Sequence, residues 1–130
     1  MIKGSCLCGA VSFEIQGTLH SARYCHCTDC RKFSGTGNAA WALAHTNQVT
    51  IAPSAPEVTK FNSGGGLRVF CAACGSPLWY EPADRPQYRG IPLGAIDEGD
   101  VAKPVMHLWT KSKAPWETIS DDLPQHETRP

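Results

Sequence analysis

Seven cysteines, gathered in three short groups, constrain this chain more than any other feature of its sequence. Residues 6 to 8 read CLC, residues 25 to 30 read CHCTDC, and residues 71 to 74 read CAAC. An odd number of cysteines fits poorly with disulfide pairing. Closely spaced cysteines in a reducing compartment such as the cytoplasm are typical of metal ligands. The grouping therefore predicts thiolate metal sites.

The first and last groups predict a closed, structural zinc site. A glycine follows each pair, and glycine tolerates the positive φ angle of a tight knuckle around a metal ion. Together the two pairs supply four thiolates, from Cys6, Cys8, Cys71 and Cys74. Such a site would join the start of the chain to its middle and contribute on the order of 10 kcal/mol to folding. Buried cysteines without a metal are the alternative.

The middle group, Cys25, Cys27 and Cys30, predicts a second zinc site with one position open. Three protein ligands and a free fourth position are how zinc is held when it takes part in chemistry. In an extended segment His26 points away from its two cysteine neighbours, so we expect it behind the ligands rather than among them. Zinc with three thiolates carries a formal charge of minus one and acidifies water poorly. The site therefore favours thiol chemistry over hydrolysis.

Short alternating segments predict a mainly β fold. Apolar and polar side chains alternate over residues 10–16, as in a half-buried strand. Weaker strand signals, separated by glycine- and proline-containing turns, cover 39–43, 49–52, 58–61, 67–71, 77–80, 87–91 and 105–110. The only helix expected is a single turn over residues 28–33, capped by Thr28 or Asp29. The glycine run at 64–66 predicts a hairpin turn rather than a phosphate loop.

The length of 130 residues fits one domain, which we place at residues 1–119. Residues 120–130 are polar and predict a loosely packed tail. Twelve basic side chains balance twelve acidic ones, so nothing favours nucleic acid or an acidic membrane surface as a partner. No stretch approaches the roughly 20 apolar residues of a membrane span. We expect a cytoplasmic protein with a small-molecule or protein partner.

Four segments resemble the glutathione-dependent formaldehyde-activating enzyme family, which includes the centromere protein V domain. They are GSCLCGAV at 4–11, YCHCTDCRKFSG at 24–35, FNSGGGLRVFCAACGSPLWY at 61–80 and MHLWTKSKAPW at 106–116. The resemblance implies short twisted antiparallel sheets around a structural zinc, a fold described as a β-tent, with little helix. It also implies a second, catalytic zinc. Matching motifs assign the structural ion to the two pairs and the catalytic ion to the triplet, as the spacing does.

The resemblance implies a carbon-sulfur lyase-type enzyme that acts on the thiol adduct of a small aldehyde. The namesake reaction joins glutathione and formaldehyde to S-hydroxymethylglutathione. Glutathione carries carboxylates that favour basic partners, and Arg31, Lys32 and Arg68 adjoin the metal motifs. Solvated surface charge is an equally good interpretation of each. Trp116 is expected to pack rather than to stack on a substrate. The alternative function is a non-catalytic zinc-binding module or a thiol redox module.

Overall fold

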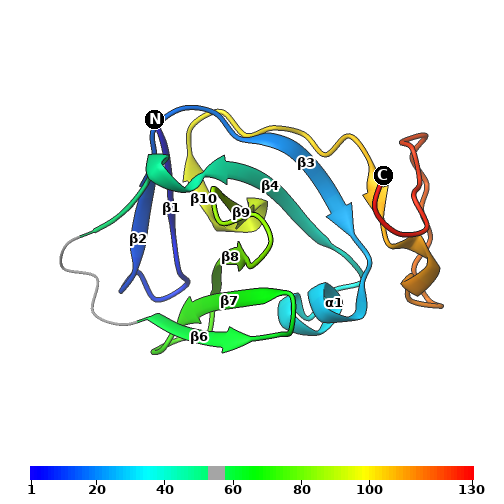
Figure 1. The fold of residues 1–130 in the computed structure, drawn as a ribbon, viewed down its shortest axis with the longest axis horizontal. Helices are drawn as coiled ribbons and strands as arrows, with labels where there is room; N and C mark the ends of the chain where they lie inside the picture. Colours follow the sequence, from blue (N-terminus) through cyan, green and yellow to red (C-terminus); the bar gives the residue numbers. More distant parts are fainter. Residues whose placement is uncertain (53–57) are drawn as a thin grey trace.

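The computed structural model describes residues 1–52 and 58–130, and strands dominate it (Figure 1). The predicted mainly β fold with little helix is confirmed. One sheet has the order β10-β1-β2-β5. Its strands are β1 (Ile2–Ser5), β2 (Ser12–Ile15), β5 (Val49–Ile51) and β10 (Ile96–Glu98).

The second, larger sheet has the order β11-β3-β4-β9-β8-β7-β6. Its strands are β3 (His20–Cys25), β4 (Ala39–His45), β6 (Val58–Asn62), β7 (Gly66–Cys71), β8 (Pro77–Pro82), β9 (Tyr88–Pro92) and β11 (His107–Leu108). Neighbouring strands are antiparallel, except that β11 runs parallel to β3. The glycine run forms the predicted hairpin turn between β6 and β7, closed by a hydrogen bond from Ser63 N–H to the Gly66 carbonyl.

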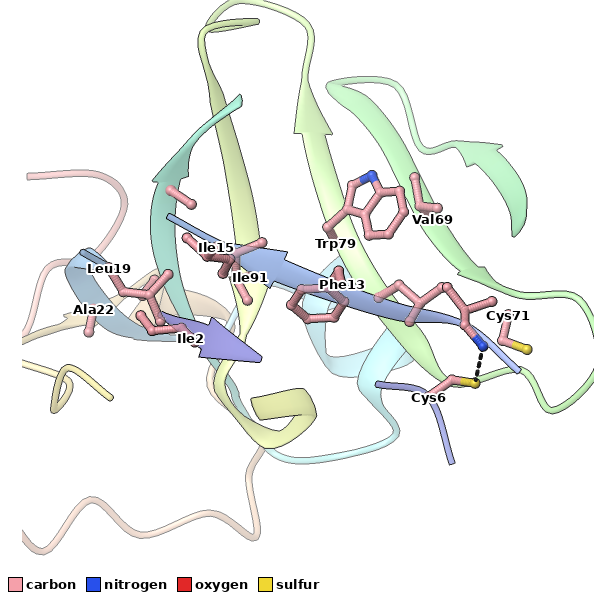
Figure 2. Close-up of a cluster of buried hydrophobic side chains, with 14 residues drawn as sticks. Ile2, Cys6, Phe13, Ile15, Leu19, Ala22, Val69, Cys71, Trp79 and Ile91 are labelled. Atoms are coloured by element: carbon pink, nitrogen blue, oxygen red, sulfur yellow. Dashed lines mark hydrogen bonds between the residues drawn. The ribbon is translucent and has the colours of Figure 1, made fainter. Parts of the chain in front are cut away.

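The sheets bury their apolar faces in one shared cluster (Figure 2). From β2, the alternating pattern turns Phe13 and Ile15 inward. Trp79 of β8 meets the Phe13 ring edge-on, with ring centroids 6.3 Å apart, and Ile91 of β9 packs into the same cluster. Because both sheets contribute to this cluster, the ends of β1 and β7 are brought close together.

The single α-helix of the described chain, α1 (Thr28–Ser34), is too short to cross a membrane, and no other described helix is long and apolar enough to do so. The expected caps were wrong, because Cys27 is the N-cap residue and its Sγ accepts a hydrogen bond from Cys30 N–H at 3.3 Å. The helix ends where Gly35 adopts a φ of 68°. A candidate metal ligand therefore also starts the helix and fixes Cys30 beside it. Three-residue 3-10 helices lie at Thr46–Gln48, Leu93–Ala95 and Thr110–Ser112.

Residues 120–130 differ from the loosely packed tail that we expected. Their side chains are mostly exposed, but their backbone follows β11. His107 N–H donates to the Pro124 carbonyl at 2.8 Å, and Trp109 N–H donates to the Thr128 carbonyl at 3.1 Å. The physical reason is that β11 is an edge strand, whose backbone groups need partners on the side that faces away from β3.

Candidate metal centres

Cys6, Cys8, Cys71 and Cys74 meet where β1 leaves its sheet and the β7–β8 hairpin begins its turn. The four sulfur atoms lie within 4.8 Å of one another. Two of the separations are 3.6 Å, between Cys6 and Cys8, and 3.8 Å, between Cys8 and Cys71. Sulfurs around a tetrahedral zinc with Zn–S bonds of about 2.3 Å stand about 3.8 Å apart. The residues therefore fit a closed four-thiolate zinc site that links the two sheets.

Two matching backbone knuckles shape this site. Gly9 has a φ of 79° and Gly75 a φ of 77°. Each glycine donates its N–H to the carbonyl of the first cysteine of its pair, at 3.1 Å for Cys6 and 2.8 Å for Cys71. A Cβ atom at either glycine would meet nothing within 4 Å, so the backbone angle rather than crowding requires glycine here.

Hydrogen bonds support the sulfur atoms of this site. Val11 N–H donates to Cys6 Sγ at 3.3 Å, the dashed line in Figure 2. The Ser76 hydroxyl lies 3.3 Å from Cys74 Sγ, and its hydrogen bond lowers the pKa of Cys74 to about 5. Such donors stabilise the thiolate form that binds a metal ion.

The second group brings together Cys25 at the end of β3, Cys27 at the cap of α1 and Cys30 inside α1. Their sulfur atoms also lie within 4.8 Å of one another. Cys25 and Cys30 are buried, whereas Cys27 is half-buried. The triplet can therefore supply three thiolates to a metal ion, and Cys27 is its most exposed member.

The crowded sulfurs of the triplet have different acidities. Hydrogen bonds from Cys25 and Cys30 lower the pKa of Cys27 to about 2. The same contact with Cys27 raises the pKa of Cys25. The three thiols titrate as one coupled group, and all of them must lose their protons when a metal ion binds.

His26 lies behind the triplet, as expected, and is fully buried. Its Nε2 is 2.9 Å from His107 Nδ1, and His107 Nε2 is 3.0 Å from both carboxylate oxygens of Asp121. With neutral rings, His107 donates its Nε2–H to the carboxylate and accepts at Nδ1 from His26. Desolvation lowers the pKa of His26 and so favours this neutral form. The sequence carried no signal for this chain of contacts.

The three basic residues that the sequence indicated, Arg31, Lys32 and Arg68, do not lie together. Arg31 and Lys32 line a shallow pocket of about 200 Å³ on the outer side of α1. Arg31 donates to the Ser112 carbonyl at 3.0 Å, and Lys32 is exposed. Trp116 borders the same pocket and is 70% exposed, so the expectation that it packs was wrong. In the segment around Trp116, the buried residue is Ala114.

Arg68 lies on the inner side of the triplet. Only 6% of its surface is exposed, and two of its guanidinium nitrogens are 3.8 and 3.9 Å from Cys30 Sγ. Its position in the sequence, three residues before Cys71, did not indicate that it faces a cysteine of the other group.

Aromatic side chains surround the triplet. Trp41 is buried against Cys25 and Cys30 in a small apolar cluster. Partly buried Phe33, Tyr80 and Trp109 pack against the same cluster. Trp109 has a φ of 58°, unusual for a bulky residue. Phe33 and Tyr80 occur inside the quoted motifs, which was the only sequence signal for them.

Comparisons with known proteins show which proteins this chain is similar to. The family model described as "Glutathione-dependent formaldehyde-activating enzyme" matches residues 1–112, which include all seven cysteines. A protein of Halomonas elongata named "Putative glutathione-dependent formaldehyde-activating enzyme" is 29% identical over 128 residues, covering 92% of this chain and 81% of that protein. The crystal structure of a Rhodobacter sphaeroides protein, 25% identical, matches with a TM-score of 0.63 over 75% of this chain and 90% of that one.

Proposed function

Since the chain belongs to the glutathione-dependent formaldehyde-activating enzyme family, we propose that it is a zinc-dependent enzyme of the carbon-sulfur lyase type. Its proposed substrates are a small thiol and a small aldehyde, with glutathione and formaldehyde as the pair that the family name gives. The observation that carries the proposal is the cysteine triplet, whose three sulfurs lie within 4.8 Å of one another and include that of half-buried Cys27. Three thiolates and an open position suit a thiol as the incoming ligand.

The proposed reaction joins its two substrates without oxidation. The thiol sulfur bonds to the aldehyde carbon, the π pair of the carbonyl moves to its oxygen, and the proton released by the thiol ends on that oxygen. A zinc ion held by Cys25, Cys27 and Cys30 would supply the position at which the thiol binds as thiolate. Cleavage of the adduct is the same reaction in reverse.

The surrounding residues serve this chemistry in two ways. Trp41 and its partly buried aromatic neighbours pack around the triplet and limit water there, which strengthens electrostatic interactions with the sulfurs. Arg31 and Lys32 supply positive charge to the pocket on the outer side of α1. Thr28, which directly follows Cys27 in the sequence, lines the same pocket. We assign these two residues to the carboxylates of the thiol substrate.

The four-thiolate site has a structural role in this proposal. It joins β1 of one sheet to the β7–β8 hairpin of the other, and its closed ligand set leaves no position for a substrate. Both sites need reduced thiols, and all seven cysteines are free. A reducing compartment such as the cytoplasm is therefore part of the proposal.

An exchange experiment tests the activity directly. Glutathione and ¹³C-formaldehyde interconvert with their adduct even without a catalyst, and magnetisation-exchange NMR measures the rate of this interconversion. The intact protein should raise this rate in proportion to its concentration, and Cys27→Ser should not. A rate equal to that of the uncatalysed reaction would refute the proposal. That outcome would favour a thiol redox module, because the three adjacent free thiols could also serve redox chemistry.

A further inference from the structure

We propose that Arg68 is the buried counter-charge of the triplet site and enables this site to accept an anionic thiolate as its fourth ligand. The inference rests on the proposed function, because it assumes that Cys25, Cys27 and Cys30 hold a metal ion. It adds a positioning residue, which acts through Cys30 on the metal rather than on the carboxylates of the substrate.

The burial of Arg68 requires an explanation. Charged side chains are almost never buried unless they are paired. Arg68 is 6% exposed, yet none of the ion pairs within residues 1–52 and 58–130 includes it. Its Nε donates to the Ser63 hydroxyl at 3.2 Å, which is a neutral partner. Across the described residues, the guanidinium charge therefore has no carboxylate to balance it.

The guanidinium is instead directed at a sulfur. Both terminal nitrogens lie near Cys30 Sγ, at 3.8 and 3.9 Å, which is within the range of hydrogen bonds to sulfur. The Phe33 ring lies 5.6 Å and the Tyr80 ring 4.8 Å from the guanidinium carbon. These aromatic contacts hold the planar group in place, as cation–π partners do. The positive charge is thus fixed beside one of the three candidate ligands.

The charges explain what this contact accomplishes. A divalent ion with three thiolates has a formal charge of minus one, and the charge of Arg68 makes the group neutral. An incoming thiolate then joins a neutral group rather than an anionic one. Hydrogen bonds to Cys30 also withdraw electron density from that ligand, so the metal attracts its fourth ligand more strongly. The charge of Arg68 raises the affinity of the site for a neutral fourth ligand much less.

Arg89 offers a matched control. It lies in β9, its guanidinium stacks 5.1 Å from the Trp79 ring, and its side chain is 17% exposed. Unlike Arg68, it pairs with a carboxylate, that of Glu81, at 4.0 Å. Arg89→Met therefore removes a stacked, largely buried arginine without removing a charge from the triplet.

The test uses the full chain loaded with Co²⁺ under anaerobic, reducing conditions. At a fixed pH, the sulfur-to-cobalt charge-transfer band reports the binding of 2-mercaptoethanol, a thiol without carboxylates, and of imidazole, a neutral ligand. We expect Arg68→Met to weaken mercaptoethanol binding at least about tenfold and to change imidazole binding less than about twofold. Arg68→Lys should recover part of the thiol affinity, and Arg89→Met should match the wild type.

Other outcomes separate the two proposals. Equal thiol affinity in Arg68→Met and wild type would overturn the inference, as would an equal loss for thiol and imidazole. If Arg68→Met fails to fold, Arg68→Gln takes its place as the neutral variant. Loss of the second cobalt ion in the neutral variants but not in Arg68→Lys would also support a counter-charge. Wild-type protein that binds only one cobalt ion would overturn the proposed function, and this inference with it.

Discussion

His26 Nε2 and His107 Nδ1 lie 2.9 Å apart, and both rings are almost completely shielded from solvent. This hydrogen bond ties the segment between Cys25 and Cys27 to β11. Asp121 extends the contact into the C-terminal segment, beyond the residues that the family model matches. Hydrogen bonds through His107 therefore connect His26, which lies between Cys25 and Cys27, to the C-terminal segment.

Asp121→Asn should release the C-terminal segment from β11. The variant keeps the size of the side chain but removes the charge that accepts from His107. Hydrogen exchange at pH 7 should show lower protection of the Trp109 and His126 amides, which bond between the two segments. Asp122→Asn, a change at an exposed neighbour, should leave these amides as protected as in the wild type. Unchanged protection in Asp121→Asn would contradict this role.

Acid should release the same segment from the wild-type protein. The hydrogen bond from His107 lowers the pKa of Asp121 below its ordinary value. A carboxyl group with a lowered pKa in the folded state stabilises at pH values above its unfolded pKa of about 3.9 and loses that contribution as the pH falls through the folded value. Amide protection, corrected for intrinsic exchange, should therefore decline below about pH 4. If amide protection depended on pH in the same way in the wild type and in Asp121→Asn, the prediction would be refuted.

Cys27→Ser should keep the fold and lose one zinc ion. Serine is a good N-cap residue, so α1 retains its hydrogen bond to the cap, and the half-buried position leaves little cavity. Metal analysis should find one zinc ion per chain, and the thermal unfolding temperature should stay within a few degrees of the wild type. Two zinc ions in this variant would remove the triplet from consideration as a metal site.

Cys8→Ser should instead destabilise the whole protein. The side chain of Cys8 is exposed, so the substitution removes little packing and tests the metal ligand itself. Because structural zinc contributes on the order of 10 kcal/mol to folding, the loss should amount to several kcal/mol or prevent folding. Leu7→Ala, at an 88% exposed neighbour, should change the free energy of unfolding by no more than about 0.5 kcal/mol. A melting curve for Cys8→Ser equal to that of Leu7→Ala would argue against a structural metal.

Local patterns made much of the fold predictable. The alternation over residues 10–16 marks β2, because one side of that strand faces the core. The cysteine spacing indicated which sulfurs come together within each group, since a knuckle is a local structure, and the need of zinc for four ligands indicated that the two pairs meet. By contrast, β3 reads HSARYC without alternation, and neighbouring strands on both sides decide its conformation. Strands β1 (IKGS) and β10 (IDE) each contain a single large apolar side chain, so no apolar alternation marks them.

Apart from the meeting of the two cysteine pairs, contacts between distant segments were not predictable. Asp121 meets His107 only because the C-terminal segment pairs with the open edge of β11. Arg68 follows the glycine hairpin in the sequence, and nothing nearby indicates that it faces Cys30, which precedes it by 38 residues. The N-cap of α1 differs from the prediction because a cysteine sulfur, rather than a side-chain oxygen, accepts the helix N–H.

The most direct measurement is the zinc content of protein purified under reducing conditions, followed by X-ray absorption at the zinc edge before and after glutathione is added. We predict two zinc ions per chain, and a gain in the average number of sulfur neighbours when glutathione binds at the triplet. Cys27→Ser should hold one zinc ion and show no change. One zinc ion in the wild-type protein, or two whose sulfur neighbours do not respond to the thiol, would contradict the proposed catalytic site.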